Sequence, residues 1–191
     1  MKFTLPHIKH SSDFGIERHP WRAVKSDPAL GRRIAAAYLA APQGSSEALP
    51  AYRAMREETW RQFDYLTGRL GVAVHVMLED PYSEAAAMFA ELRCGRLRVF
   101  STAAGDNPHP LWSNDDNDAF RAVHDAFGHG ATGRGFDRHG EEAAWRHHAS
   151  MYSPLARQAV ATETRGQNCA LVYGPGGFPP QKLVLLPEAW S

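Results

Sequence analysis

Apolar side chains recur every three to four positions in two early stretches of the chain, which is the spacing of helices that bury one face. The first stretch is residues 28–41, where Asp27 is a good N-cap and Pro28 suits the first helical position. The second opens at Ser45-Ser46, with Pro50 marking a later alternative start, and ends at Gly71, a residue type that often terminates helices. The apolar positions of this second helix are Tyr52, Met55, Trp60, Phe63, Leu66 and Leu70.

The period of the pattern changes after the second helix. Residues 72–78 alternate and are rich in valine, which predicts a β-strand, and residues 97–101 predict another. Between them, residues 83–93 predict a short helix that Gly95 closes. The sequence leaves open whether the two strands pair.

Helical spacing returns at residues 115–128, after a polar loop at residues 103–117. The pattern as a whole predicts a single α+β domain, mostly helical, over residues 1–191. The remaining expectations are a glycine-rich connector at residues 130–140, helices at 141–152 and 154–168, an extended tail at 181–187 and an extended arm at 1–27 that Trp21 anchors.

The composition is that of an ordinary globular protein, with 43% hydrophobic and 22% charged residues. The formal net charge is zero, so bulk electrostatics favours neither nucleic acid nor an anionic membrane as a partner. No apolar run approaches the ~18 residues of a membrane span, and the N-terminus lacks a signal-peptide core, so we expect a cytoplasmic protein. Cys94 and Cys169 have no CxxC spacing and leave a single disulfide open.

Histidine is the unusual component, with ten residues, and five of them cluster between positions 124 and 148. This clustering suggests a metal site, because imidazole is a common metal ligand. The clustered histidines are His124, His129, His139, His147 and His148.

Two of these histidines stand five residues apart, in the segment from His124 to His129. His124 is in phase with Phe120 and Phe127 and is therefore expected to point inward. On a regular helix His129 would sit about 140° round from His124. Gly128 allows the last turn to unwind or to form a π-type bulge that swings His129 back. The spacing differs from the i,i+4 pair of zinc peptidases.

A third ligand must come from elsewhere in the chain. Glu163 is the first choice, because it falls late in a predicted helix with a partly inward phase. Four other residues are also candidates for the third ligand. Of His147 and His148, at least one is expected to face solvent, since neighbours do not share a helix face. The full set of competitors is Glu141, Glu142, His147 and His148.

Residues 96–129 resemble the iron-binding region of the pterin-dependent aromatic amino acid hydroxylases. As in that family, an Arg-Val-Phe strand, here Arg98-Val99-Phe100, leads through a loop, here Pro110-Leu111-Trp112, into a helix with two histidines five residues apart. Thr162-Glu163 is similar to the Thr-x-Glu context of the family's third ligand, offset by one. The ending Lys182-Leu183-Val184-Leu185-Leu186-Pro187-Glu188 resembles the family's C-terminal Lys-Leu-Leu-Pro.

The resemblance implies a mononuclear non-haem Fe(II) monooxygenase, a hydroxylase of an aromatic or other small substrate that uses O2. His124, His129 and Glu163 would hold the iron, and a tetrahydropterin is the candidate reductant. Asp125 would take the place of a family residue near the pterin. The other candidate site residues are Arg165 for catalysis and Trp112, Arg121 and Phe127 for binding substrate or cofactor.

Two departures from the family keep other functions open. The chain is much shorter than the family's catalytic domain, and Asn107 and His109 occupy the neighbourhood of the family's carboxylate-binding arginine. The first alternative is a metal-dependent hydrolase, because His124-Asp125 is a His-Asp doublet of the kind found in HD phosphohydrolases. The second alternative is a non-catalytic binding protein with a hydroxylase-like fold. The sequence does not indicate the oligomeric state.

Overall fold

The computed structural model describes residues 21–190, and most of the expected N-terminal arm, residues 1–20, lies outside this range. The described chain is mostly helical with one small sheet, which confirms the α+β prediction at that level. The helices are α2 (Pro28–Ala40), α3 (Leu49–Asp64), α4 (Ala85–Arg93), α5 (Asn114–Val123), α6 (Arg138–Ala149), α7 (Pro154–Ala161) and α8 (Gln167–Tyr173), and the strands are β1 (Ala73–Met77) and β2 (Arg96–Phe100).

Shorter helical segments extend or join these elements. Three of them have π-helical geometry and continue a preceding α-helix, and the others are single 3₁₀ turns. The π-helical segments are Tyr65–Arg69 after α3, His124–Gly130 after α5 and Thr162–Gly166 after α7; the 3₁₀ turns are Trp21–Ala23, Ser46–Ala48 and Glu188–Trp190.

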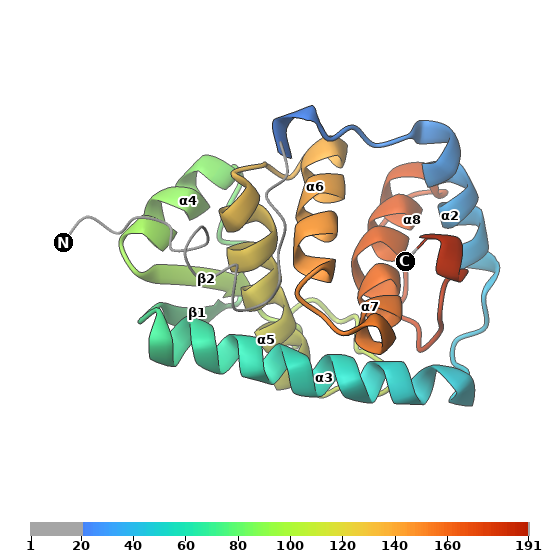
Figure 1. The fold of residues 1–191 in the computed structure, drawn as a ribbon, viewed down its shortest axis with the longest axis horizontal. Helices are drawn as coiled ribbons and strands as arrows, with labels where there is room; N and C mark the ends of the chain where they lie inside the picture. The colour runs from blue at the N-terminus through green and yellow to red at the C-terminus, as the bar shows by residue number, and fades with distance from the viewer. Residues whose placement is uncertain (1–20, 191) are drawn as a thin grey trace.

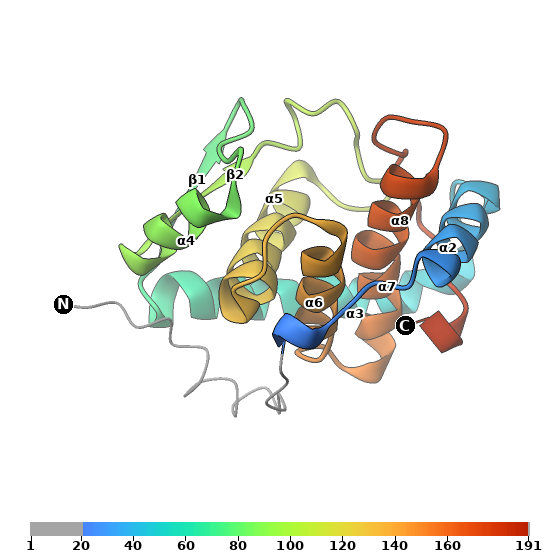
Figure 2. The ribbon, with the colours of Figure 1, turned by 90° about the horizontal axis from the view of Figure 1, so that it is seen from above.

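The long helix α3 runs beneath α5 and α7, as Figure 1 shows. The sheet and α4 lie at one end of the molecule and α2 with α8 at the other, with α5 and α6 between them (Figures 1 and 2). Apolar side chains of α3, α5 and α7 meet in one large buried cluster that includes Tyr52, Met55, Phe120, Val123 and Val160. This core supports α5, the helix that leads into the histidine pair.

Helix boundaries follow local sequence signals. Asp27 caps α2 by accepting hydrogen bonds from the backbone N–H groups of Ala29 and Leu30, as predicted. The second helix begins at the later of the two expected starts, because Ser45 caps only a 3₁₀ turn and α3 begins at Leu49, with Pro50 in its first turn. Gly71 ends the extended α3 region with a positive φ of 68°.

The two strands pair in parallel, which answers the question that the sequence left open. Ala73 lies opposite Arg96 and Met77 opposite Phe100, with α4 as the crossover helix. The C-terminal tail docks as expected, because Leu183 forms a bridge with Gly44 and the Lys182 ammonium donates to the carbonyls of Tyr38 and Leu39 at 2.8 and 3.0 Å.

Both cysteines are free, so the open question of a disulfide is answered for this structure. Across residues 21–190, no helix combines the length and the apolar character that crossing a bilayer requires.

Asp116 connects the start of α5 to α3 through side-chain hydrogen bonds. Its Oδ1 accepts from Arg56 Nε at 2.7 Å and from Trp60 Nε1 at 2.8 Å, and its Oδ2 accepts from the Ser113 hydroxyl and N–H at 2.9 and 3.0 Å. Ser113 in turn caps the helix, which completes a capping box. Burial alone would raise the pKa of Asp116, but these hydrogen bonds outweigh burial and lower it.

We therefore expect Asp116→Asn to lower the free energy of unfolding by about 2 kcal/mol at pH 7, since charge-assisted hydrogen bonds are lost. Because the folded pKa lies below the unfolded one, this stabilisation is present at neutral pH and fades as the pH falls below about 4. Urea unfolding at several pH values measures the effect. Asp115→Asn, at the exposed neighbouring position, is the matched control. An equal loss of stability in both variants would contradict the stabilising role of the Asp116 hydrogen bonds.

Candidate metal centre

The two histidines lie on the π-helical segment His124–Gly130, which continues α5 without a break. A π-helix pairs residues i and i+5, so it brings His124 and His129 to the same side of the segment. Their ring centroids are 5.2 Å apart and the rings are nearly perpendicular, at 86°. The predicted π-type distortion of this turn is therefore confirmed, and it is what unites two side chains that a regular helix would separate.

Gly128 permits a close approach at this turn. A Cβ atom at position 128 would lie 3.2 Å from the His124 ring and 3.2 Å from the Cβ of Ala144 on α6. The absence of a side chain thus lets α6 pack directly against the histidine segment.

Glu141 completes a three-residue group with His124 and His129. It lies in the first turn of α6, which Asp137 caps by accepting from the N–H groups of His139 and Gly140. One ligand atom from each of the three side chains lies within 4.8 Å of the other two, and Glu141 Oε1 is 3.4 Å from His129 Nε2. Two imidazoles and one carboxylate are the ligand set of mononuclear non-haem iron sites.

Glu163, the predicted third ligand, is not part of this group. Its carboxylate accepts a 2.6 Å hydrogen bond from the Tyr52 hydroxyl and another of 2.6 Å from Gln167 Nε2. His109 Nε2 lies 3.5 Å away and carries the proton, because His109 Nδ1 accepts from the backbone N–H groups of residues 111 and 112. The inward phase of Glu163 thus reflects a buried carboxyl group that accepts hydrogen bonds from Tyr52 and Gln167, and Glu141 lies beside the histidines instead.

The other competitors for the third ligand have different roles. Both His147 and His148 are buried, so the expectation that at least one would face solvent is wrong. His147 Nδ1 donates to the carbonyl of Phe127 at 2.5 Å, while His148 Nδ1 meets His124 Nδ1 at 3.2 Å. The Trp21 ring packs against His147, and the Phe120 and Tyr152 rings pack against His148, so both neighbours are covered.

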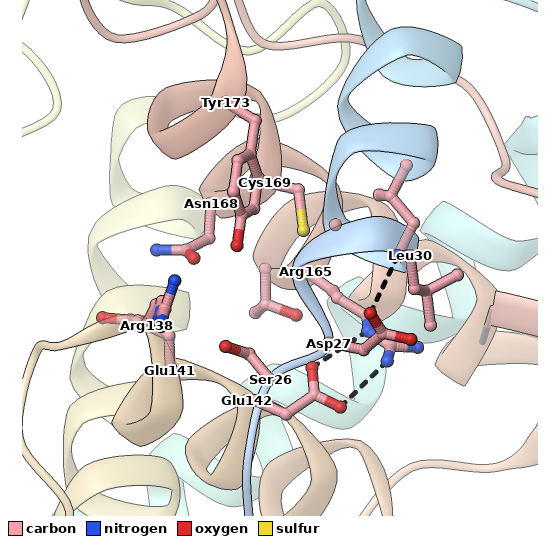
Figure 3. A pocket seen from close by; sticks show the side chains of 13 residues that line it. Ser26, Asp27, Leu30, Arg138, Glu141, Glu142, Arg165, Asn168, Cys169 and Tyr173 are labelled. Atoms are coloured by element: carbon pink, nitrogen blue, oxygen red, sulfur yellow. Dashed lines mark hydrogen bonds and ion pairs between the residues drawn. The ribbon is translucent and has the colours of Figure 1, made fainter.

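Arg165 does not lie in the cavity beside the histidines, which corrects its prediction as a catalytic residue. Its guanidinium binds Glu142 through contacts of 2.9 and 3.1 Å and lies 4.1 Å from the centroid of the Trp145 ring. Figure 3 shows this ion pair in a separate, small cavity between α2, α6 and α8, with Cys169 close by. Arg165 and Glu142 are therefore structural partners.

The ring nitrogens that face away from the group already have partners. His129 Nδ1 donates to the carbonyl of Arg134 at 3.1 Å, which leaves the lone pair of Nε2 directed at the group. His124 Nδ1 is engaged by His148, which leaves Nε2 free in the same way. This arrangement fits metal binding, because ligating histidines generally donate their other ring N–H to a neighbouring acceptor.

Burial and neighbouring charges act differently on the ionisable groups of the centre. Burial, with a smaller contribution from His129, lowers the pKa of His124 to about 4, so its imidazole is neutral at pH 7. Burial alone would also lower the pKa of His129, but the hydrogen bond and charge of Glu141 raise it. Burial raises the pKa of Asp125 to about 7.

The group opens onto a cavity of about 620 Å³, a size suited to small molecules. Asp125, Arg121 and Glu163 line this cavity. Trp112 and Phe127, predicted to bind substrate or cofactor, are not among the residues that line this cavity and belong to the buried core. The aromatic lining comes from Tyr82, Phe100, Phe120, Phe136 and Phe178.

The sequence does not reveal the acceptors that lie behind the histidines. The Arg134 carbonyl, which accepts from His129, is a backbone group, and Gln62, whose Oε1 contacts His148 Nε2 at 3.0 Å, is an amide within a helix. Glu141 was one of the four competitors for the third ligand, and its place in a helix first turn was equally compatible with a role in the helix dipole. Comparison with family models, with curated proteins and with solved structures finds no match for this chain.

Proposed function

We propose that the chain is a mononuclear non-haem Fe(II) monooxygenase whose iron ligands are His124, His129 and Glu141. The observation that carries the proposal is that two histidines and one carboxylate have ligand atoms within 4.8 Å of one another on the wall of a cavity. This ligand set leaves coordination positions open for exogenous molecules. The earlier resemblance to aromatic amino acid hydroxylases supports the same chemistry, with Glu141 in place of Glu163.

In the proposed reaction, one oxygen atom of O2 is inserted into a substrate C–H bond to give C–OH. The other oxygen atom is reduced to water by two electrons and two protons, and a tetrahydropterin is the candidate source of the electrons. The bound iron would supply the activation of O2. Hydrogen bonds to His124 and His129 hold the ligand rings, and the surrounding apolar wall limits water near the reacting atoms.

The cavity favours a small substrate with an aromatic body and a negative charge. Phe100, Phe120 and Phe136 lie on its wall, and Arg121 on α5 offers a cation one turn before His124. Arg121 Nε is buried without a hydrogen-bond partner, and its guanidinium carbon lies 6.0 Å from the centroid of the Phe100 ring. A buried guanidinium nitrogen without a partner costs free energy that an anionic ligand group recovers.

We expect Arg121→Gln to weaken the binding of an aromatic carboxylate such as 3-phenylpropionate by roughly tenfold, the loss of a charge-assisted hydrogen bond of about 1.4 kcal/mol. Isothermal titration measures this change. The matched control is Arg157→Gln on α7, outside the cavity lining. Equal affinity in wild type and Arg121→Gln would exclude Arg121 as an anion anchor.

The experiment that tests the proposed function is O2 consumption by Fe(II)-loaded protein in the presence of tetrahydropterin. Consumption above the rate of free Fe(II) is expected, with loss in His124→Ala and His129→Ala and retention in His75→Ala, an exposed histidine on β1. If iron binds at the site and neither tetrahydropterin nor ascorbate supports O2 consumption, the monooxygenase proposal fails.

A metal-dependent hydrolase is the second candidate, and the observation that favours it is Asp125 on the cavity wall next to His124. In the HD pattern that aspartate would itself be a ligand, whereas Glu141 completes the group in the described chain. Hydrolysis of bis-p-nitrophenyl phosphate by Zn²⁺- or Mn²⁺-loaded protein would favour this candidate. If the protein neither consumes O2 nor hydrolyses the phosphodiester but still binds 3-phenylpropionate, a non-catalytic binding protein is favoured.

A further inference from the structure

A chain of hydrogen bonds runs from His124 into the core of the protein. His124 Nδ1 contacts His148 Nδ1 at 3.2 Å, and His148 Nε2 contacts Gln62 Oε1 at 3.0 Å. The three side chains come from three elements, since Gln62 lies on α3, His148 on α6 and His124 at the end of α5.

The contacts permit only certain proton positions. Two ring nitrogens 3.2 Å apart form a hydrogen bond only if one carries a proton and the other presents a lone pair. An amide oxygen is only an acceptor, so with Gln62 Oε1 as its partner His148 Nε2 must carry a proton. A neutral His148 then presents its Nδ1 lone pair, and His124 must donate from Nδ1.

The proton position on His124 decides whether it can bind a metal. With its proton on Nδ1, the Nε2 atom has a free lone pair. If the Gln62 amide were turned to present its NH2 group, both imidazoles would take the opposite tautomer, and Nε2 of His124 would carry a proton. A protonated ring nitrogen cannot be a ligand.

We propose that Gln62 is a positioning residue of the metal centre, which acts through His148 to hold His124 in the Nδ1–H tautomer that binds metal. This inference rests on the proposed metal site but concerns proton positions that exist in the metal-free protein. The packing supports it, because Phe120 stacks against both rings, with centroid distances of 6.1 Å to His124 and 5.7 Å to His148. His148 is fully buried, so water does not compete with Gln62 as its partner.

The test combines ¹⁵N NMR of the histidine rings in metal-free protein with titration by Co²⁺. In wild type, His124 is expected as the Nδ1–H tautomer, and Gln62→Met, which keeps the length but removes the acceptor, should yield a mixture of tautomers. Co²⁺ affinity in Gln62→Met should fall by about 10- to 100-fold, the usual effect of losing a partner of a ligating histidine.

The matched control is Thr59→Val, one turn earlier on α3, which removes a buried hydroxyl that bonds Tyr152 at 2.9 Å. It should lower stability without altering the His124 tautomer or the Co²⁺ affinity. An Nε2–H tautomer of His124 in wild type overturns the inference, whether or not Gln62→Met folds. An unchanged tautomer and affinity in folded Gln62→Met overturn it as well. If wild type has the expected tautomer but does not bind Co²⁺, the proposed metal site fails while the tautomer assignment stands.

Discussion

Replacing Glu141 by glutamine is expected to lower the affinity for Fe(II) or Co²⁺ by more than about 100-fold, because even residues that only touch a ligand contribute about 10- to 100-fold. The substitution keeps the size of the side chain and removes the charge of the only carboxylate that groups with the two histidines in the described chain. Competition with a chelator of known affinity measures the change.

The matched variant is Glu163→Gln, which removes the same charge from the same cavity wall. Glu163 accepts hydrogen bonds from Tyr52 and Gln167, and a glutamine cannot accept from all of these donors. We therefore expect Glu163→Gln to lose about 1–3 kcal/mol of stability and to keep its metal affinity. Loss of metal binding in Glu163→Gln with retention in Glu141→Gln would restore Glu163 as the ligand and contradict the present assignment.

Replacing Gly140 by alanine is expected to be among the most damaging changes outside the centre. A Cβ atom at position 140 would overlap the backbone carbonyl of Gly135, so the loop that precedes α6 must move. Overpacking of this kind costs about 3 kcal/mol when it involves backbone. Because Glu141 is the next residue, we also expect the folded fraction of this variant to bind Co²⁺ weakly.

Thermal unfolding and Co²⁺ titration of Gly140→Ala measure both effects. Gly68→Ala is the control, because Gly68 is exposed in a helical segment and a Cβ there would meet no atom within 4 Å. That variant should be neutral or slightly more stable, since alanine favours helical geometry over glycine. Wild-type stability and metal affinity in Gly140→Ala would contradict the role of this tight loop.

Local signals in the sequence were sufficient for most of the fold. The helices were predicted from apolar spacing, from Asp27 as an N-cap and from Gly71 as a terminator, because these signals act within a few residues. The π-helical turn was predictable for the same reason, since His124, Gly128 and His129 belong to one segment. Pairing of the strands was not predictable, because it depends on contacts between segments distant in the sequence.

Helix phase could not choose the candidate third ligand, and it left Glu141 among the competitors to Glu163. An inward carboxylate can hold a metal or can be bound by buried donors, and only the fold reveals that Tyr52, 111 residues away in the sequence, donates to Glu163. The same limit applies to Arg165, whose partner Glu142 comes from another helix. Trp112 and Phe127 are apolar enough for a pocket wall or a core, and their contacts with the Tyr52 and Tyr65 rings assign them to the core.

The central claim is that one metal ion binds between His124, His129 and Glu141. The most direct measurement is X-ray diffraction from crystals loaded anaerobically with Fe(II), with data collected on both sides of the iron absorption edge. The account predicts one anomalous peak within about 2.0–2.2 Å of a nitrogen of each histidine and an oxygen of Glu141. A peak bound to Glu163 instead, or no peak at the two histidines at full iron loading, would contradict it.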